Sequence, residues 1–600
     1  MSRRARILLT LAAASLPLPA TAAGHGPPVN AADTTLGADA SACPGRAINA
    51  DRVVTGSFGT AQQGSYVMVP FEVPVDTTAV RVKYCYDQPE NPISTPLVSV
   101  RHTLDLGIYE PLRPGSTYWE TPEFRGWGGS SHPDVTVSPE GFSTEAEFTA
   151  VPRVEPPGKT TRAFRPGPIP GGKWAVELGV AAVVPQSQGD ADGTVAWRVE
   201  IELRGNRAFA DEPYQPATYD ERPARSRGGW YAGDLHVHAE HSAYNDAPMT
   251  EVFDYAFTPL DEGGAGLDFI TLSDYVSGSG WGEIGRHQGE YPGKLIARSA
   301  EVITYRGHLN NHVSAQVVEY REGPILQRRG DGSLVPLRGR RPARKTFADI
   351  HRAGGFTQIN HPTIFPSTVP TFAMFCRGCP WDYSRDETDY SQVDAIEVAT
   401  GPSDLEAVPP PLVAGPNPFT ATAIQFYEDA LSTGAKIAAV GVSDSHNAGR
   451  TPNAVLQAPI GEATTMVHAE ELSERGIACA VRRGHTYAKV TGNAGPDVRL
   501  DAGGPGVQGR PAMMGDTFRD VRANFRARVL RGTGTVLMLV KDGVTIRVEP
   551  IPDADHKVRM PSVGFGRYRL QLMRGTAIET VSSPIHFEPG VGTVEREACG

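Results

Sequence analysis

The chain has 600 residues, more than one hydrophobic core usually organises, so we expect roughly two to four domains. Its net charge of −11 argues against nucleic acid as a main partner, because binding to a phosphate backbone requires a basic face. Glycine (65) and proline (51) are abundant, which favours turn-rich β structure at the flanks.

The first residues have the pattern of a secretory signal peptide. A basic start (2–6) precedes an apolar run (7–18), and small residues at 20–23 provide an Ala-x-Ala cleavage site. The apolar run is too short to span a bilayer and is interrupted by Pro17. We therefore predict a signal peptide over 1–23, no membrane anchor, and a secreted or periplasmic protein.

The six cysteines permit disulfides in an exported chain, and their pairing is not deducible from the sequence. Cys376 and Cys379 form a C-x-x-C, a spacing that occurs in redox motifs and in half of a zinc knuckle. Since no second C-x-x-C completes a zinc knuckle, we expect a structural disulfide there, either local or to a distant cysteine.

The N-terminal region is predicted to form β structure. Residues 24–44 are rich in Ala, Asp and Gly and are predicted to be disordered. From 45 to 210, short segments such as 79–84 alternate apolar and polar residues, so that each strand would bury one face. Repeated strands of this kind predict a β-sandwich. Three of its residues are interpreted as structural or rim residues: Asp105, Trp127 and His132.

A different pattern follows a proline- and charge-rich linker predicted over 211–229. Over 230–495, short apolar strands alternate with helical segments, which predicts a mainly parallel sheet, open or closed into a barrel. The predicted strands are 233–238, 267–272, 356–359, 395–398 and 437–441, and the predicted helices are 249–257, 346–353 and 422–433. The Arg-rich segment 328–345 is interpreted as a solvated loop. A small C-terminal β-domain is predicted over 496–600.

Metal-ligand residue types follow the predicted central strands. His236 and His238 are one residue apart on a strand and therefore point to the same side. Glu301, His361 and Asp444 come at the ends of three further strands. Because the carboxyl ends of parallel strands meet at one edge, these side chains are expected to converge. Converging imidazole and carboxylate groups indicate a site for divalent metal ions.

Taken in order, these elements resemble the polymerase and histidinol phosphatase (PHP) superfamily. The segments 233–238 (GDLHVH), 360–362 (NHP) and 441–446 (GVSDSH), with Glu301 and His308, resemble its CehA/McbA branch, the carbaryl-hydrolase-like metallohydrolases. The resemblance implies a multi-domain protein. Its centre would be a distorted (β/α)7 PHP-type barrel, flanked by the N-terminal β-sandwich and the small C-terminal β-domain.

The resemblance also implies a ligand set for two ions. The first ion would be held by His236, His238, Glu301 and Asp444. Glu301 would bridge to a second ion, which would be completed by His361 and by either His308 or His312. Both of these histidines stay candidates: His308 follows Gly307 in the family's element, and His312 is interpreted as the start of an apolar strand, 312–315.

A third ion would require His241, His446 and a histidine where this chain has Tyr275. A neutral phenol is a poor zinc ligand because its ordinary pKa is near 10. Tyr275 could ligate iron as a phenolate, or it could donate a hydrogen bond to a developing oxyanion. We therefore expect two divalent ions (zinc, manganese or iron), and the third site stays open.

These residues predict an exported hydrolase. Metal-activated water would cleave an ester, amide, carbamate or phosphoester bond in a small molecule, and Asp444 or Asp274 would move the proton. The branch resemblance favours the ester, amide or carbamate. Arg286, Arg298 and Arg306 could line the pocket and bind an anionic group. No G-x-S-x-G supports a serine hydrolase. The alternative is a degenerate PHP-like ectodomain acting as a binding or structural module. The oligomeric state is not encoded in any of these patterns.

Overall fold

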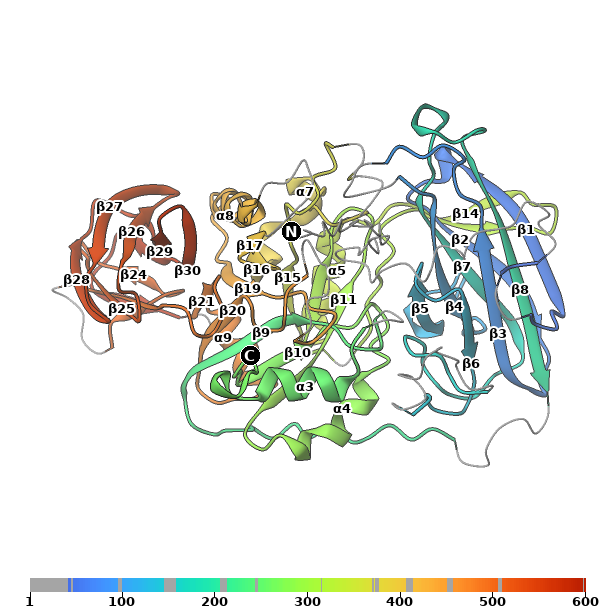
Figure 1. Ribbon diagram of the computed structural model, residues 1–600, viewed down its shortest axis with the longest axis horizontal. Helices are drawn as coiled ribbons and strands as arrows, with labels where there is room; N and C mark the ends of the chain where they lie inside the picture. Colours follow the sequence, from blue (N-terminus) through green and yellow to red (C-terminus); the bar gives the residue numbers. More distant parts are fainter. Residues whose placement is uncertain are drawn as a thin grey trace, which may run out of the picture.

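The computed structural model describes residues 42–44, 47–94, 100–144, 158–205, 213–242, 246–314, 316–369, 372, 377–405, 414–449, 457–504, 510–596 and 598–599. The predicted signal peptide, most of the predicted disordered segment and Cys376 lie outside these residues. Figure 1 shows three parts side by side, with the residues that follow the predicted linker in the middle. The predicted domain bounds stay predictions. Among the described helices, none is long and apolar enough to cross a lipid bilayer.

The N-terminal part consists of two sheets on one core. Its strands are β1 (Arg52–Gly59), β2 (Tyr66–Val73), β3 (Thr77–Tyr86), β4 (Thr103–Tyr109), β5 (Phe124–Gly129), β6 (Asp134–Val137), β7 (Gly172–Ala182) and β8 (Thr194–Gly205). The order is β1-β8-β3-β6 in one sheet, and β2-β7-β4-β5 are neighbours in the other. Val69 from the second sheet and Val82 from the first belong to the same buried cluster, because alternate residues of each strand face inward.

The Arg-rich segment is exposed at 329–333 and 339–340, as a solvated loop would be, but it is not a loop throughout. It forms the hairpin β13 (Ile325–Arg328) and β14 (Leu334–Arg338), which extends the second N-terminal sheet to the order β14-β13-β2-β7-β4-β5. β13 runs parallel to β2, with Ile325 opposite Tyr66. Ile325 is buried, and Leu326 and Leu334 pack on the N-terminal core, so a few apolar side chains suffice to fix the hairpin. In Figure 1 it reaches from the middle of the molecule to the N-terminal strands.

The central part contains a curled sheet. Its strands are β9 (Gly229–Val237), β10 (Phe269–Leu272), β11 (Leu295–Val302), β12 (Leu309–His312), β15 (Phe356–Ile359), β16 (Ala395–Thr400), β19 (Ala438–Val442), β20 (Thr464–Ala469) and β21 (Thr486–Lys489). The order is β19-β16-β15-β12-β11-β10-β9-β20-β21. β9, β10 and β11 are parallel, as are β15, β16 and β19, but β12 is antiparallel to both of its neighbours.

The two distant strands β9 and β19 meet just beyond their carboxyl ends. The backbone N–H of Asp444 donates to the carbonyl of His236 at 3.0 Å, and that of His238 donates to the carbonyl of Ser445 at 2.9 Å. The sheet therefore bends round far enough to bring its first strand back to β9. The predicted (β/α)7 barrel stays a prediction.

Helices pack beside this sheet. They are α3 (Met249–Phe257), α4 (Trp281–His287), α5 (Ala343–Arg352), α7 (Arg385–Thr388), α8 (Pro418–Leu431) and α9 (Glu474–Arg482), and a two-stranded ribbon is formed by β17 (Asp404–Leu405) and β18 (Gly415–Pro416). α3 has the predicted bounds. α8 begins four residues before the predicted start at 422, because the side chain of Asn417 accepts the N–H of Phe419 and Pro418 occupies the first helical position.

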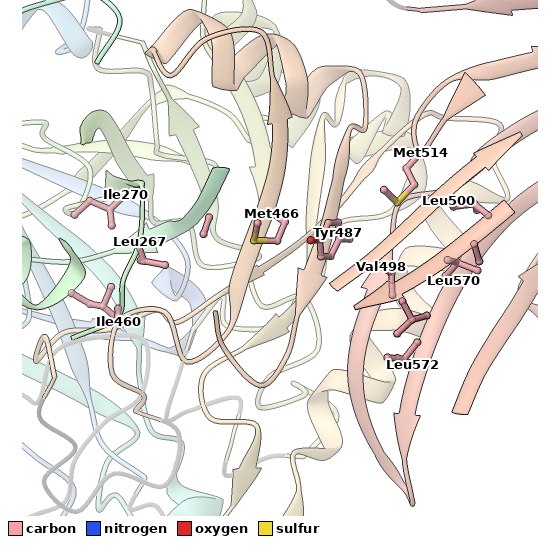
Figure 2. Close-up of a cluster of buried hydrophobic side chains, with 14 of the residues drawn as sticks. Leu267, Ile270, Ile460, Met466, Tyr487, Val498, Leu500, Met514, Leu570 and Leu572 are labelled. Carbon is pink, nitrogen blue, oxygen red and sulfur yellow. The ribbon is translucent and has the colours of Figure 1, made fainter. Parts of the chain in front are cut away.

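The C-terminal strands continue the central sheet. They are β22 (Asp497–Gly503), β23 (Ala512–Met513), β24 (Thr517–Arg519), β25 (Asn524–Leu530), β26 (Thr535–Lys541), β27 (Val544–Ile551), β28 (Asp555–Pro561), β29 (Gly566–Arg574), β30 (Ala577–Ser582), β31 (Ile585–Glu588) and β32 (Thr593–Glu595). β21 pairs with β30, and a separate sheet has the order β23-β22-β25-β28. Figure 2 shows one buried cluster running from Ile270 through Met466 and Tyr487 to Leu500 and Leu572. The central and C-terminal strands thus share a core.

Two disulfides join described cysteines: Cys43 to Cys85 and Cys479 to Cys599. Cys379 is disulfide-bonded as well. Disulfides of this kind persist in oxidising compartments, which fits the predicted export.

Candidate metal centre

Two groups of three ligand-type side chains lie close enough to hold metal ions. The ligand atoms within each group are all within 4.8 Å of one another. The first group is His236, His238 and Asp444, and the second is Glu301, His308 and His361. Five of the six side chains are almost completely buried, whereas the side chain of Asp444 is 12% exposed. Solvent therefore approaches the centre past Asp444.

The candidate ligands lie at or near strand ends, where the sequence predicts them. The Nε2 atoms of His236 and His238 are 3.0 Å apart, because residues i and i+2 at the end of β9 share a face. Asp444 and His361 each lie two residues beyond a strand and have positive φ values of 53° and 26°. Residues other than glycine rarely adopt this backbone conformation, and residues that do adopt it cluster at functional sites.

Glu301, in β11, lies between the two groups. Its Oε1 is 3.2 Å from Nδ1 of His308, 3.3 Å from Nε2 of His361 and 3.5 Å from Nε2 of His236. Its Oε2 is 3.6 Å from Nε2 of His238 and, among the described residues, has no hydrogen-bond partner. A buried carboxylate oxygen without a donor is costly, and a cation between the groups would satisfy it.

Each histidine of the two groups is anchored through one ring nitrogen and presents the other to the centre. Nδ1 of His236 donates to Glu397, and Nδ1 of His361 donates to the carbonyl of Cys379 at 2.9 Å. Nε2 of His308 donates to the carbonyl of Arg377 at 3.2 Å. In the neutral rings, which are the form that binds a metal, these acceptors fix the tautomer in which the nitrogen facing Glu301 carries a lone pair.

His238 is anchored through a hydroxyl. Its Nδ1 lies 2.8 Å from Oγ of Ser242, which itself donates to Asp274 at 2.8 Å. Asp274 also accepts the N–H of Ala239 at 2.7 Å. Burial raises the pKa of Asp274 to about 7, although these hydrogen bonds oppose the rise. Asp274 therefore supports His238 and is not a member of either ligand group.

The electrostatic field of the centre favours a cation. Burial lowers the pKa of His236, but the carboxylates of Asp444, Glu301 and Glu397 outweigh it and raise that pKa well above its ordinary value. Burial also lowers the pKa of His361, but Glu301, Glu397 and Asp444 outweigh it and raise that pKa to about 9. By contrast, burial and the neighbouring His446 lower the pKa of His238 to about 4, which keeps this imidazole neutral.

Glu397, in β16, contacts both groups and is not among the residues that the sequence indicates. Its Oε1 accepts from His236 at 2.8 Å, and its Oε2 accepts the backbone N–H of His361 at 2.6 Å. A charged residue in the middle of the apolar strand 395–400 was the available indication, since buried carboxylates occur where they are paired.

The structure separates His308 from His312. Both ring nitrogens of His312 are engaged, with Ser299 at 3.0 Å and Gln358 at 3.2 Å, and its ring stacks on Phe356. The prediction that His312 begins a strand is wrong, because β12 ends there. Since β12 is antiparallel to its neighbours, its first residues lie at the edge with the ligands and its last residue points toward the opposite edge.

The residues expected for a third ion lie beside the first group without forming a ligand group of their own. Oη of Tyr275 is 3.5 Å from Nε2 of His446. The His446 ring stacks on His238 with centroids 4.2 Å apart, and its Nδ1 is 2.8 Å from Asp246. Nδ1 of His241 instead contacts Ser279 at 2.9 Å.

The N-terminal part reaches this centre. The ring of Trp127 stands edge-on to Tyr275 with centroids 6.0 Å apart. Asp105 accepts a hydrogen bond from Tyr305 of the central part at 2.7 Å. His132, which is buried, contacts Ser131 and the carbonyl of Gly128. Trp127 is therefore a wall of the site, and Asp105 joins the two parts.

The three arginines suggested as anion ligands point elsewhere. Arg298 pairs with Glu474 at 2.6 Å, and Arg286 and Arg306 pair with Glu283 and Glu387. Arg298 and Glu301 are three residues apart on β11 and so occupy opposite faces.

Comparison with known proteins finds a similarity to a solved structure. No family model matches the chain, and no curated protein matches it. Among solved structures it is similar to a two-domain protein from Bacteroides vulgatus described as containing a predicted PHP-like metal-dependent phosphoesterase. The identity is 16%, the TM-score is 0.31, and the match covers 65% of this chain and 99% of the other. A TM-score of 0.31 establishes no common fold, so the assignment of the site rests on its own side chains.

Proposed function

We propose that the protein is a metal-dependent hydrolase of the PHP type. The observation that carries this proposal is the set of four histidines, each anchored through one ring nitrogen, that turn the other nitrogen toward Glu301 and Asp444. His236, His238 and Asp444 would hold one divalent ion, His308 and His361 a second, and Glu301 would bridge them. Zinc, manganese and iron all accept such mixed imidazole and carboxylate ligands.

Divalent ions bound there would lower the pKa of water to about 7 and polarise the bond under attack. Residues of the chain would orient the ligands, accept the proton and stabilise the oxyanion. Glu397 and the carbonyls of Arg377 and Cys379 hold the imidazoles in the required tautomer. Asp444 is the most accessible ligand and is placed to take the proton from the attacking water. Tyr275, with its hydroxyl near His446, is placed to donate to an oxyanion.

The proposed substrate is a small molecule with a carboxylic ester, amide or carbamate bond. The ion pairs of Arg286, Arg298 and Arg306 support this choice over a phosphoester, because they leave these guanidinium groups occupied. The resemblance of the motifs to the CehA/McbA branch supports the same choice. Export to the periplasm or the medium is proposed from the N-terminal sequence pattern, and the disulfides support it.

The test combines elemental analysis with two substrates. The purified protein should contain about two equivalents of a divalent metal, as paired sites of this kind do. It should hydrolyse p-nitrophenyl acetate faster than bis-p-nitrophenyl phosphate, and a chelator should abolish both activities. Glu301→Gln should lose metal and turnover together, whereas Glu290→Gln, at a side chain 61% exposed, should lose neither. A protein without metal and without chelator-sensitive turnover would instead be a binding or structural module on the same fold.

A further inference from the structure

A cavity of about 590 Å³ lies where α9 meets the C-terminal strands. Trp230, near the start of β9, lines it, whereas the metal ligand His236 is six residues further along. At about 3.3 Å per residue the two positions are roughly 20 Å apart. The volume is in the range of small-molecule sites, and none of the metal-centre residues lines this cavity.

The lining is basic although the whole chain has a net charge of −11. Five arginines border the cavity against three carboxylates. The arginines are Arg475, Arg483, Arg499, Arg510 and Arg596, and the carboxylates are Glu470, Glu471 and Asp501. The pKa of His468 is consistent with this local excess of positive charge. Burial lowers that pKa most, and the nearby His485, Arg499 and Arg510 lower it further.

Three of the arginines are held in place. The guanidinium of Arg499 stacks 3.9 Å from the ring centroid of Trp230 and also donates to Tyr487. Arg596 pairs with Asp516 at 3.1 Å, and the Cys479–Cys599 disulfide ties the end of the chain to the cavity wall. Arg483 pairs with Glu470 at 3.2 Å.

Arg475 and Arg510 differ from these three. Both are exposed, and no carboxylate in the described part of the chain forms an ion pair with either. Their guanidinium groups border a cavity that also has apolar surface, from the half-buried Trp230 and Met513. The neighbouring Leu500 and Met514 are fully buried in the shared core shown in Figure 2, so this side of the cavity is fixed by packing.

We propose that this cavity binds an organic anion, with its carboxylate or phosphate at Arg475 and Arg510 and its apolar body against Trp230 and Met513. Guanidinium groups match the geometry of oxyanions and form charge-assisted hydrogen bonds with them. The apolar body would be removed from water against Met513, because a methionine side chain adapts to irregular shapes. The site is separate from the metal centre and does not depend on its function.

The probe is naphthalene-2-carboxylate, titrated by isothermal calorimetry against the full chain. We expect saturable binding that weakens with added salt, since the contacts are between charges. The neutral naphthalene-2-carboxamide should bind about tenfold more weakly, as should inorganic phosphate, which lacks the apolar body. Arg475→Ala/Arg510→Ala should weaken the carboxylate about tenfold or more.

Two controls locate the binding. Arg113→Ala removes an arginine that is 63% exposed in the N-terminal part and should leave the affinity within about twofold. Glu301→Gln, which disables the metal centre, should also leave it unchanged, so that a carboxylate bound to metal is distinguished from one bound here. Absence of binding to the wild type, equal binding of the carboxamide, or an affinity that survives Arg475→Ala/Arg510→Ala in a protein with an unchanged unfolding temperature would each overturn the proposal.

Discussion

The carboxylate of Glu397 lies 2.8 Å from Nδ1 of His236, although 161 residues separate the two in the chain. Its second oxygen accepts the backbone N–H of His361. Both partners of this pair are fully buried, so no water replaces the contact. One carboxylate thereby orients a ligand from each of the two groups.

Glu397→Gln should weaken metal binding by about 10- to 100-fold, as losses of such outer partners do. The carboxylate accepts from His236, Gln358, Thr400 and the N–H of His361, and an amide would offer these donors only one oxygen, so the His236 tautomer is no longer enforced. The measurement is metal affinity against a competing chelator, with Glu290→Gln as the exposed control. Unaltered affinity would show that the pair serves packing alone.

Tyr275→Phe should lower kcat about 100-fold, the effect of losing one oxyanion donor, while the metal content stays unchanged. The reason is that the Tyr275 hydroxyl lies beside His446, which belongs to neither ligand group. Steady-state kinetics and elemental analysis on the same preparation check this. If the variant loses metal in proportion to its activity, Tyr275 is a ligand instead.

The stability of the protein should depend on pH through Asp105. Burial raises the pKa of Asp105 to about 7 in the folded chain, far above its ordinary value. The folded state then binds more protons than the unfolded state, so this residue's stabilising contribution is present below about pH 4 and declines as pH rises to about 7. Asp105→Asn should reduce the loss of unfolding free energy between pH 5 and 8 by roughly 2 kcal/mol. Urea unfolding at both pH values measures it, and Asp76→Asn, at an exposed position, should change nothing.

Removal of the Cys479–Cys599 disulfide should destabilise the chain. This bond closes a loop with a sequence separation of 120, so its loss should lower the free energy of unfolding by about 2–5 kcal/mol. The check is denaturant unfolding of Cys479→Ser/Cys599→Ser beside the oxidised wild type. The metal content should stay unchanged, since neither cysteine lies in a ligand group. A coincident loss of metal would contradict this separation.

The sequence alone determined which residue types stand at the strand ends. Period-two spacing placed His236 and His238 on one face, and the strand-end rule brought Glu301, His361 and Asp444 into the same neighbourhood. The structure gathers all five within the two ligand groups. Helix α3 was also predicted at its observed bounds, because its amphipathic pattern is local.

Only the tertiary structure decided the remainder. It selected His308 over His312, because the antiparallel direction of β12 sets which of its ends faces the ligands. It brought Glu397 to His236, and it attached the Arg-rich hairpin to the N-terminal sheet, where Ile325 lies opposite Tyr66. The direction of a strand and its pairing partner are set by the packing of segments far apart in the chain. A local pattern of apolar and polar residues therefore does not predict either of them.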